Sequence, residues 1–267
     1  EQIAYGVAYM LGDDEKNNVR SIRKCIAAVL ADLETVTETQ WLKRYLMGMS
    51  TGADIVLDLH CDHQALLHLY MGTALWPEGR ALALQMEAGV TLLADNSGGE
   101  PFDEANSKLW WELAEKFPSH AIPAACFAAT VELRGITDTD SLLVQKDSDN
   151  IFHFLQRRGY IAGEAAPFLE EADAYAVPLS GVDYVVAPVP GIVSFFKNPG
   201  DLIKTGDVLG IIIDPLADGN GQTEFIAHTD GLLFARAADR IARPGKILAK
   251  VAGRTPLAGK GSQLLTA

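Results

Sequence analysis

The chain has 267 residues, of which 48% are apolar and 21% charged, a composition typical of a globular protein that can bury a sizeable core. Its formal net charge of −13 disfavours nucleic acids and anionic membrane surfaces as partners. No apolar run reaches the roughly 18–20 residues of a membrane span, and three sparse cysteines indicate a reducing, cytoplasmic compartment without a disulfide framework.

Two helices are predicted ahead of the first strand. Apolar residues recur at helical spacing between about residues 17 and 33. A second helix is expected from Thr37 to Met49, because Thr37 or Thr39 can cap its N-terminus and Gly52 follows its end.

A strand that begins buried and ends in polar side chains follows at residues 53–62. Its start is a continuous apolar run, typical of a strand covered on both faces. Asp58, His60 and Asp62 then alternate, so we expect their side chains to share one face, with Cys61 packed on the other. Ligands of α/β proteins bind at the carboxyl ends of strands. His60 is therefore interpreted as a metal ligand oriented by a flanking acid, or as a general base; a histidine that is only hydrogen-bonded is the alternative.

The middle of the chain predicts a second strand, a helix and a polar loop. Residues 63–71 are expected to form a turn and then a strand, and the alanine- and leucine-rich residues 77–94 a helix. Two glycines and a proline predict a loop at residues 97–104, either a functional loop or a plain connection.

Further elements complete an alternating pattern. Residues 108–116 predict a helix, and residues 124–133 predict a strand that leads into Glu132-Leu133-Arg134-Gly135. A long helix is expected from Asp140 to Arg158, with Gly159 as its natural C-terminal cap. The order of elements predicts an α/β fold with a layered sheet and helices over residues 1–175.

A change of composition marks a linker and a β-rich domain. Glu164–Pro167 and Glu170–Asp173 are interpreted as a linker or strap. Short apolar strands with Gly and Pro turns then predict a small all-β domain over residues 182–257.

An internal repeat organises this C-terminal domain. Residues 187–195 parallel 227–235, and residues 201–211 parallel 239–250. The two halves resemble the barrel-sandwich fold of biotinyl and lipoyl carrier domains. Those carriers display a lysine on the hairpin between the halves, but Asp214–Glu224 contains none. We therefore expect the domain to cover or shape the site of its neighbour rather than to act as a carrier.

Taken together, these features resemble the succinylglutamate desuccinylase/aspartoacylase family, relatives of the zinc carboxypeptidases. The likeness covers nearly the whole chain. It depends on the β-rich C-terminal domain and on three motifs, which are Asp54–His60, Gly98–Glu104 and Val131–Gly135.

The resemblance implies a zinc-dependent hydrolase of N-acyl amino acids or similar amides and esters. It implies His60 as a zinc ligand and Glu132 as the catalytic general base, with Asp58 orienting His60. Asp62 is assigned a supporting or substrate-binding role. Arg134 is expected to bind a substrate carboxylate, or alternatively to hold Glu132.

The family's first two zinc ligands lie in an upstream Gly-x-His-Gly-x-Glu motif, which a substrate-binding Asn-x-Asn-Arg motif follows. Neither motif occurs in this chain, so we expect it to correspond to about the C-terminal two-thirds of such an enzyme. His63 and Asp62 are the local alternatives for completing a metal site. A catalytically inactive fragment or a non-enzymatic binding module is the alternative function, and a Cys61 nucleophile is a third. The expected partner is a small acylated amino acid, with a homo-oligomer as a further prediction.

Overall fold

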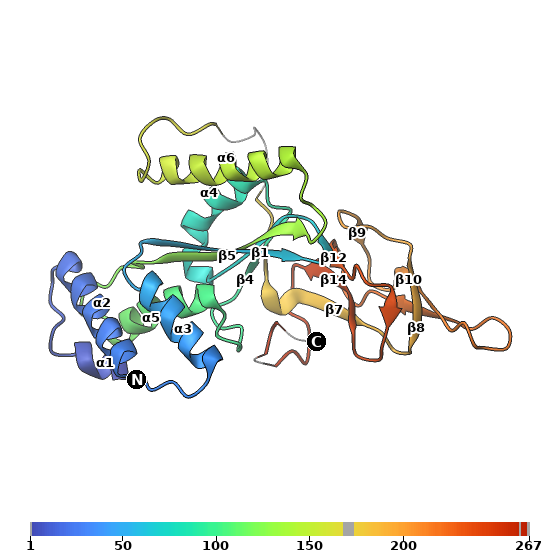
Figure 1. Ribbon diagram of the computed structural model, residues 1–267, viewed down its shortest axis with the longest axis horizontal. Helices are drawn as coiled ribbons and strands as arrows, with labels where there is room; N and C mark the ends of the chain where they lie inside the picture. Colours follow the sequence, from blue (N-terminus) through green and yellow to red (C-terminus); the bar gives the residue numbers. More distant parts are fainter. Residues whose placement is uncertain (1, 168–173, 262, 266–267) are drawn as a thin grey trace. The chain divides into compact units, whose positions relative to one another are not determined.

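The computed structural model describes residues 2–167, 174–261 and 263–265 (Figure 1). The chain divides into two compact units, Glu1–Asp58 with Glu100–Ala129, and Leu59–Gly99 with Thr130–Ala267. The described residues form six α-helices and three sheets, which confirms the predicted mixed α/β class. Of the predicted linker, Glu170–Asp173 lies outside the described residues.

Four helices belong to the first unit, and the two predicted near its start are present. In α3, Thr37 and Gln40 form a capping box, in which each side chain accepts a hydrogen bond from the other residue's backbone N–H. Side chains of α1, α2 and α5 enclose an apolar core with Ile22, Val56 and Trp110. The helices are α1 (Gln2–Val7), α2 (Glu15–Asp32), α3 (Glu38–Ser50) and α5 (Phe102–Lys116).

The helix α5 begins six residues earlier than predicted, so the loop expected at residues 97–104 ends at Pro101. Proline fixes an extended backbone before the first turn, where its missing N–H costs nothing. Asp103 and Glu104 then stand in the first turn, where negative charge is favourable to the helix dipole. These two acids are buried on a helix rather than exposed on a loop.

A five-stranded sheet has the strand order β1-β5-β3-β4-β6. The pairs β3–β4 and β4–β6 are parallel. The boundary between the two units falls within β1 and within β5. The strands are β1 (Ile55–Asp62), β3 (His68–Met71), β4 (Val90–Leu93), β5 (Phe127–Gly135) and β6 (Ala176–Pro178).

The single helix predicted over residues 77–94 is wrong in its second half. The helix α4 (Trp76–Met86) ends at Glu87, which adopts a left-handed backbone with φ 54°. The chain then enters the strand β4 (Val90–Leu93), whose four residues are apolar or β-branched and mostly buried. A short apolar run of this kind cannot be assigned to helix or strand by periodicity alone.

The helix α6 (Ser141–Arg157) packs on α4 in the second unit (Figure 1). Its bounds match the prediction, because Asp140 caps its N-terminus by accepting a hydrogen bond from the N–H of Leu142. Gly159 follows its end with φ 79°, as expected of a C-terminal cap.

The two halves of the repeat in the C-terminal region exchange short strands. In each half a short strand pairs with the other half, β9 with β12 and β13 with β8. The sheets have the orders β11-β10-β8-β13 and β2-β12-β14-β7, and they enclose one apolar core. The strands are β2 (Gln64–Ala65), β7 (Val182–Val186), β8 (Gly191–Phe195), β9 (Leu202–Ile203), β10 (Val208–Ile213), β11 (Gln222–Ile226), β12 (Gly231–Arg236), β13 (Ile241–Ala242) and β14 (Ile247–Gly253).

In the part of the chain that the structure describes, no helix is both long and apolar enough to traverse a bilayer. The domain boundaries 1–175 and 182–257 stay a prediction.

Candidate functional site

The strands β1 and β5, which carry most of the predicted site residues, are neighbours in the sheet. The N–H of Phe127 donates to the carbonyl of Asp54 at 2.9 Å, and the N–H of Ile136 donates to that of His63 at 3.2 Å. Both bonds join positions of the same sequence separation, so the strands run in the same direction and their carboxyl ends meet at one edge. Such an edge is where α/β proteins bind ligands.

In a parallel pair, the residue whose N–H donates lies level with the residue that follows the accepting carbonyl, so Phe127 lies level with Ile55, and Glu132 of β5 lies level with His60 of β1. His60 is exposed, whereas Glu132 is half-buried and one of its carboxylate oxygens is shielded from solvent. The structure therefore brings the predicted zinc ligand and the predicted general base to the same level of adjacent strands. Asp58 is half-buried two residues before His60 on β1. The roles of these three residues stay predictions.

The prediction that Cys61 is packed is wrong, because the residue is exposed. Leu59, His60 and Cys61 are exposed in succession, so neither face of this part of β1 is covered by described residues. In the strand order, β1 stands at the end of its sheet. A buried strand was expected from the apolar run, but only Val56 of that run is fully buried.

Asp62 differs from His60 in being buried inside a polar cluster. Its Oδ2 accepts a hydrogen bond from Nζ of Lys250 on β14 at 2.5 Å, and its Oδ1 accepts from the N–H of His63 at 2.7 Å. Nε2 of His68 lies 4.0 Å from Oδ2 of the same carboxylate. Because Asp62 is buried against these groups, its side chain is engaged with β14 and β3.

Burial and charge oppose each other in this cluster. Burial would raise the pKa of Asp62, but the charge and hydrogen bond of Lys250 and the N–H of His63 bring it below its ordinary value. Burial lowers the pKa of His68 to about 4, against the hydrogen bond that its Nδ1 donates to the carbonyl of Leu66. His68 is therefore neutral at pH 7, with Nε2 as its unprotonated nitrogen.

Arg134 is held by a residue that sequence reasoning did not identify. Its guanidinium donates to Oδ2 of Asp147 on α6 at 2.5 Å, and both side chains are largely buried. Its backbone has φ 66°, a left-handed conformation that is uncommon outside glycine and that often marks functional sites. The sequence predicted a substrate carboxylate or Glu132 as its partner, and the roles of Arg134 and Asp62 at the site stay predictions.

The described residues do not form a complete metal site. Within residues 2–167, 174–261 and 263–265, no group of three His, Cys, Asp or Glu side chains is arranged to hold an ion. A catalytic zinc usually has three protein ligands and one open position. His60 is the single ligand that the family resemblance assigns, so the residues described here do not fit a catalytic zinc by themselves.

The contacts of Asp62 with Lys250 and with His68 were not predicted, and the signals for them in the sequence were of different strength. Lys250 comes almost 190 positions after Asp62, and nothing in the sequence pairs the two. His68 stands in an apolar strand pattern, where a lone polar residue is a visible signal of a buried, hydrogen-bonded group.

Comparison with known proteins identifies relatives by structure. No protein-family model matches the sequence, and no curated protein matches it significantly. Solved structures do match it, and the resemblance predicted from the sequence is confirmed by them.

One match is a protein assigned to the succinylglutamate desuccinylase/aspartoacylase family from Shewanella amazonensis SB2B, with a TM-score of 0.83 and 26% identity over 94% of this chain and 70% of that chain. A protein so assigned from Shewanella frigidimarina NCIMB 400 gives 0.82 and 22% over 95% and 68%. The apo ectoine utilization protein EutE from Ruegeria pomeroyi gives 0.59 and 18% over 82% and 66%.

Proposed function

Because the chain shares the fold of succinylglutamate desuccinylase/aspartoacylase family proteins, we propose that it is a hydrolase of N-acyl amino acids or similar amides and esters. The observation that carries the proposal is the structural match at a TM-score of 0.83 over 94% of the chain, at 26% identity. The placement of Glu132 level with His60 supports it, since a base and a second polar group then face one strand-end region.

Glu132 is proposed as the general base. A carboxylate at the carboxyl end of a buried strand can take a proton from an attacking water and pass it to the leaving amine. Asp58 is proposed to orient His60, and Asp62 to support this end of β1 through Lys250.

Arg134 is proposed to recognise the carboxylate of the amino-acid product, with Asp147 setting the plane of its guanidinium. Arginine presents five donors, so one bond to Asp147 leaves others for a ligand. The names of the relatives indicate acidic substrates, succinylglutamate and acyl-aspartate among them.

Zinc is proposed as the cofactor on the strength of the resemblance, with His60 as its ligand in this chain. The remaining ligands are not among the described residues. No step proposed here depends on the ion.

The barrel-sandwich form of residues 182–257 is also a proposal. It is supported by the repeat and by the exchange of β9 and β13 between the halves. The turn between β10 and β11 contains no lysine, so we propose that the domain shapes a site and carries no prosthetic group. We also propose that the protein is cytoplasmic and forms a homo-oligomer.

The proposal is tested by measuring amine release from N-succinyl-glutamate, N-acetyl-aspartate and N-acetyl-leucine, each with and without added zinc. Release of a free amino acid from an acidic substrate is the expected result. If none of the three substrates is cleaved under either condition while the protein is folded, the binding-module alternative is favoured. The incomplete metal site is the observation that supports that alternative.

A further inference from the structure

A groove of about 910 Å³ lies in the second unit, and neither Glu132 nor His60 lines it. Gly89 and Tyr175 line it, and they precede β4 and β6 at the amino-terminal ends of those parallel strands. The other lining residues come from the turns around β9, β12 and β14. Its size is within the range of small-molecule sites.

One wall of the groove is apolar. Leu202 is 82% exposed, which is unusual for a large apolar side chain, and it pairs with Leu232 across the β9–β12 ladder. Tyr175 adds an aromatic face, and its hydroxyl donates to the carbonyl of Ala252 at 3.1 Å, so the ring has a fixed position. This wall can bind the apolar body of a ligand.

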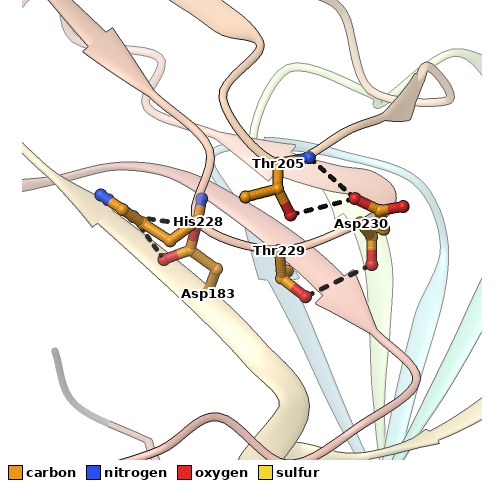
Figure 2. A network of polar contacts seen from close by, with 5 residues as sticks. All are labelled: Asp183, Thr205, His228, Thr229 and Asp230. Carbon is orange, nitrogen blue, oxygen red and sulfur yellow. Dashed lines mark hydrogen bonds and ion pairs between the residues drawn. The ribbon is translucent and has the colours of Figure 1, made fainter.

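The first cation of the groove, Lys204, is already neutralised. Its Nζ donates to Asp230 at 3.1 Å. Thr205 donates to the same carboxylate from its N–H at 2.8 Å and its hydroxyl at 3.0 Å (Figure 2). The N–H of Thr205 and the ammonium of Lys204 hold the pKa of Asp230 at about 2, so the acid is ionised. Lys204 and Asp230 therefore contribute no net charge.

The loop that carries Asp230 is fixed by a buried acid. Asp183 accepts a hydrogen bond from the N–H of His228 at 2.7 Å, and its carboxylate lies 3.2 Å from Nδ1 of the same residue. Figure 2 shows this pair on one side of Thr229 and the Thr205–Asp230 pair on the other. The ring of His228 is mostly exposed at the groove, with Nε2 directed away from Asp183.

Arg254 is the cation that remains. Its guanidinium lies 4.8 Å from the centroid of the Tyr175 ring, a cation–π contact that holds it over the apolar wall. No carboxylate in the part of the chain described by the structure pairs with it. The groove thus combines one guanidinium with an apolar wall.

We propose that this groove binds a small organic carboxylate, with the carboxylate on Arg254 and the apolar body against Tyr175, Leu202 and Leu232. Guanidinium groups bind carboxylates through paired, charge-assisted hydrogen bonds. The ordered Tyr175 ring and the fixed loop at His228 mean that the groove needs little rearrangement to accept a ligand. The proposal does not depend on hydrolase activity.

The test is a ¹H–¹⁵N NMR titration of the full chain with phenylacetate. We expect shifts at the amides of Tyr175, Leu232 and Arg254, and binding at least about tenfold weaker for Arg254→Gln, as loss of a charge-assisted bond implies. Phenylacetamide, which has the same body without the charge, should bind as weakly to the wild type. The matched control is Arg243→Gln, an exposed arginine that does not line the groove and should leave binding unchanged.

Several results would overturn the proposal. Absence of shifts at the groove with millimolar phenylacetate would remove the site. Equal binding by wild type and Arg254→Gln, or equal losses in Arg254→Gln and Arg243→Gln, would remove the role of Arg254. Inorganic phosphate binding as tightly as phenylacetate would show that the apolar wall is not used. Arg254 is exposed, so its variant is expected to fold, which the dispersion of the same spectra checks.

Discussion

Nζ of Lys250 donates to Oδ2 of Asp62 at 2.5 Å, and this ion pair joins β14 to the last residue of β1. The Asp62 side chain is 7% exposed and that of Lys250 21%, so water screens the pair poorly. The pair lies two residues beyond His60, and it therefore anchors the end of the strand that carries the proposed zinc ligand.

Replacement of Lys250 by methionine is expected to destabilise the protein by about 3 kcal/mol, because it leaves a buried carboxylate without its counter-ion. Chemical denaturation measures the change in the free energy of unfolding. Lys204→Met is the matched control, since the Lys204–Asp230 pair is exposed to water and its loss should change the free energy of unfolding much less.

The double variant Asp62→Leu/Lys250→Met separates the charge from the packing. It should recover part of the stability lost in Lys250→Met, because no charge is then left buried. A double variant less stable than Lys250→Met would contradict the importance assigned to the unpaired charge.

His68 is expected to make stability depend on pH. Its pKa is about 4 in the folded state and about 6.5 when unfolded, so between these values the unfolded chain binds a proton that the folded chain does not. Stability therefore falls as the pH drops from about 6.5 towards 4, by a total of about 3 kcal/mol.

Asp62 adds a further loss of stability at acid pH. Its pKa is lower in the folded state than the ordinary value of about 3.8, so its contribution to the free energy of unfolding is present above that pH and is lost as the pH falls below it.

The measurement for His68 is the free energy of unfolding at several pH values for wild type and His68→Asn, whose amide can still donate to the carbonyl of Leu66. A variant with the same slope between pH 6.5 and 4 would show that His68 is not the group responsible.

The space around two glycines predicts opposite effects on stability when each is replaced by alanine. A Cβ on Gly135 would lie 2.7 Å from the backbone carbonyl of His63, so Gly135→Ala should destabilise by about 1–3 kcal/mol. A Cβ on Gly48, within α3, would have no atom within 4 Å, so Gly48→Ala should stabilise by up to about 1 kcal/mol. Thermal unfolding distinguishes the two signs, and a neutral Gly135→Ala would contradict the contact.

The sequence predicted α3 and α6 well because their ends carry local signals. Thr37 and Asp140 cap α3 and α6, and these short-range hydrogen bonds are visible as residue types at fixed spacing. The strand β4 was missed because four apolar or β-branched residues after a helix carry no period of their own. The start of α5 was missed because glycine and proline upstream were weighted above the acids of its first turn.

The site could be predicted only in its local part. Alternation along β1 and β5 identified His60 and Glu132, which the structure places level with each other. The partners of Asp62 and Arg134 are set by tertiary packing, since Lys250 is on β14 and Asp147 on α6. Contacts between distant segments leave no spacing in the sequence from which to infer them.

The most direct measurement compares kcat for amine release from an N-acyl amino acid between wild type, Glu132→Gln and the surface control Glu115→Gln. The proposed role of Glu132 predicts a loss of at least about a hundredfold in kcat for Glu132→Gln, since general-base catalysis contributes roughly 10²–10⁴-fold. Glu115→Gln should match the wild type. Wild-type kcat in Glu132→Gln would contradict Glu132 as the base, and with it the hydrolase mechanism proposed for this chain.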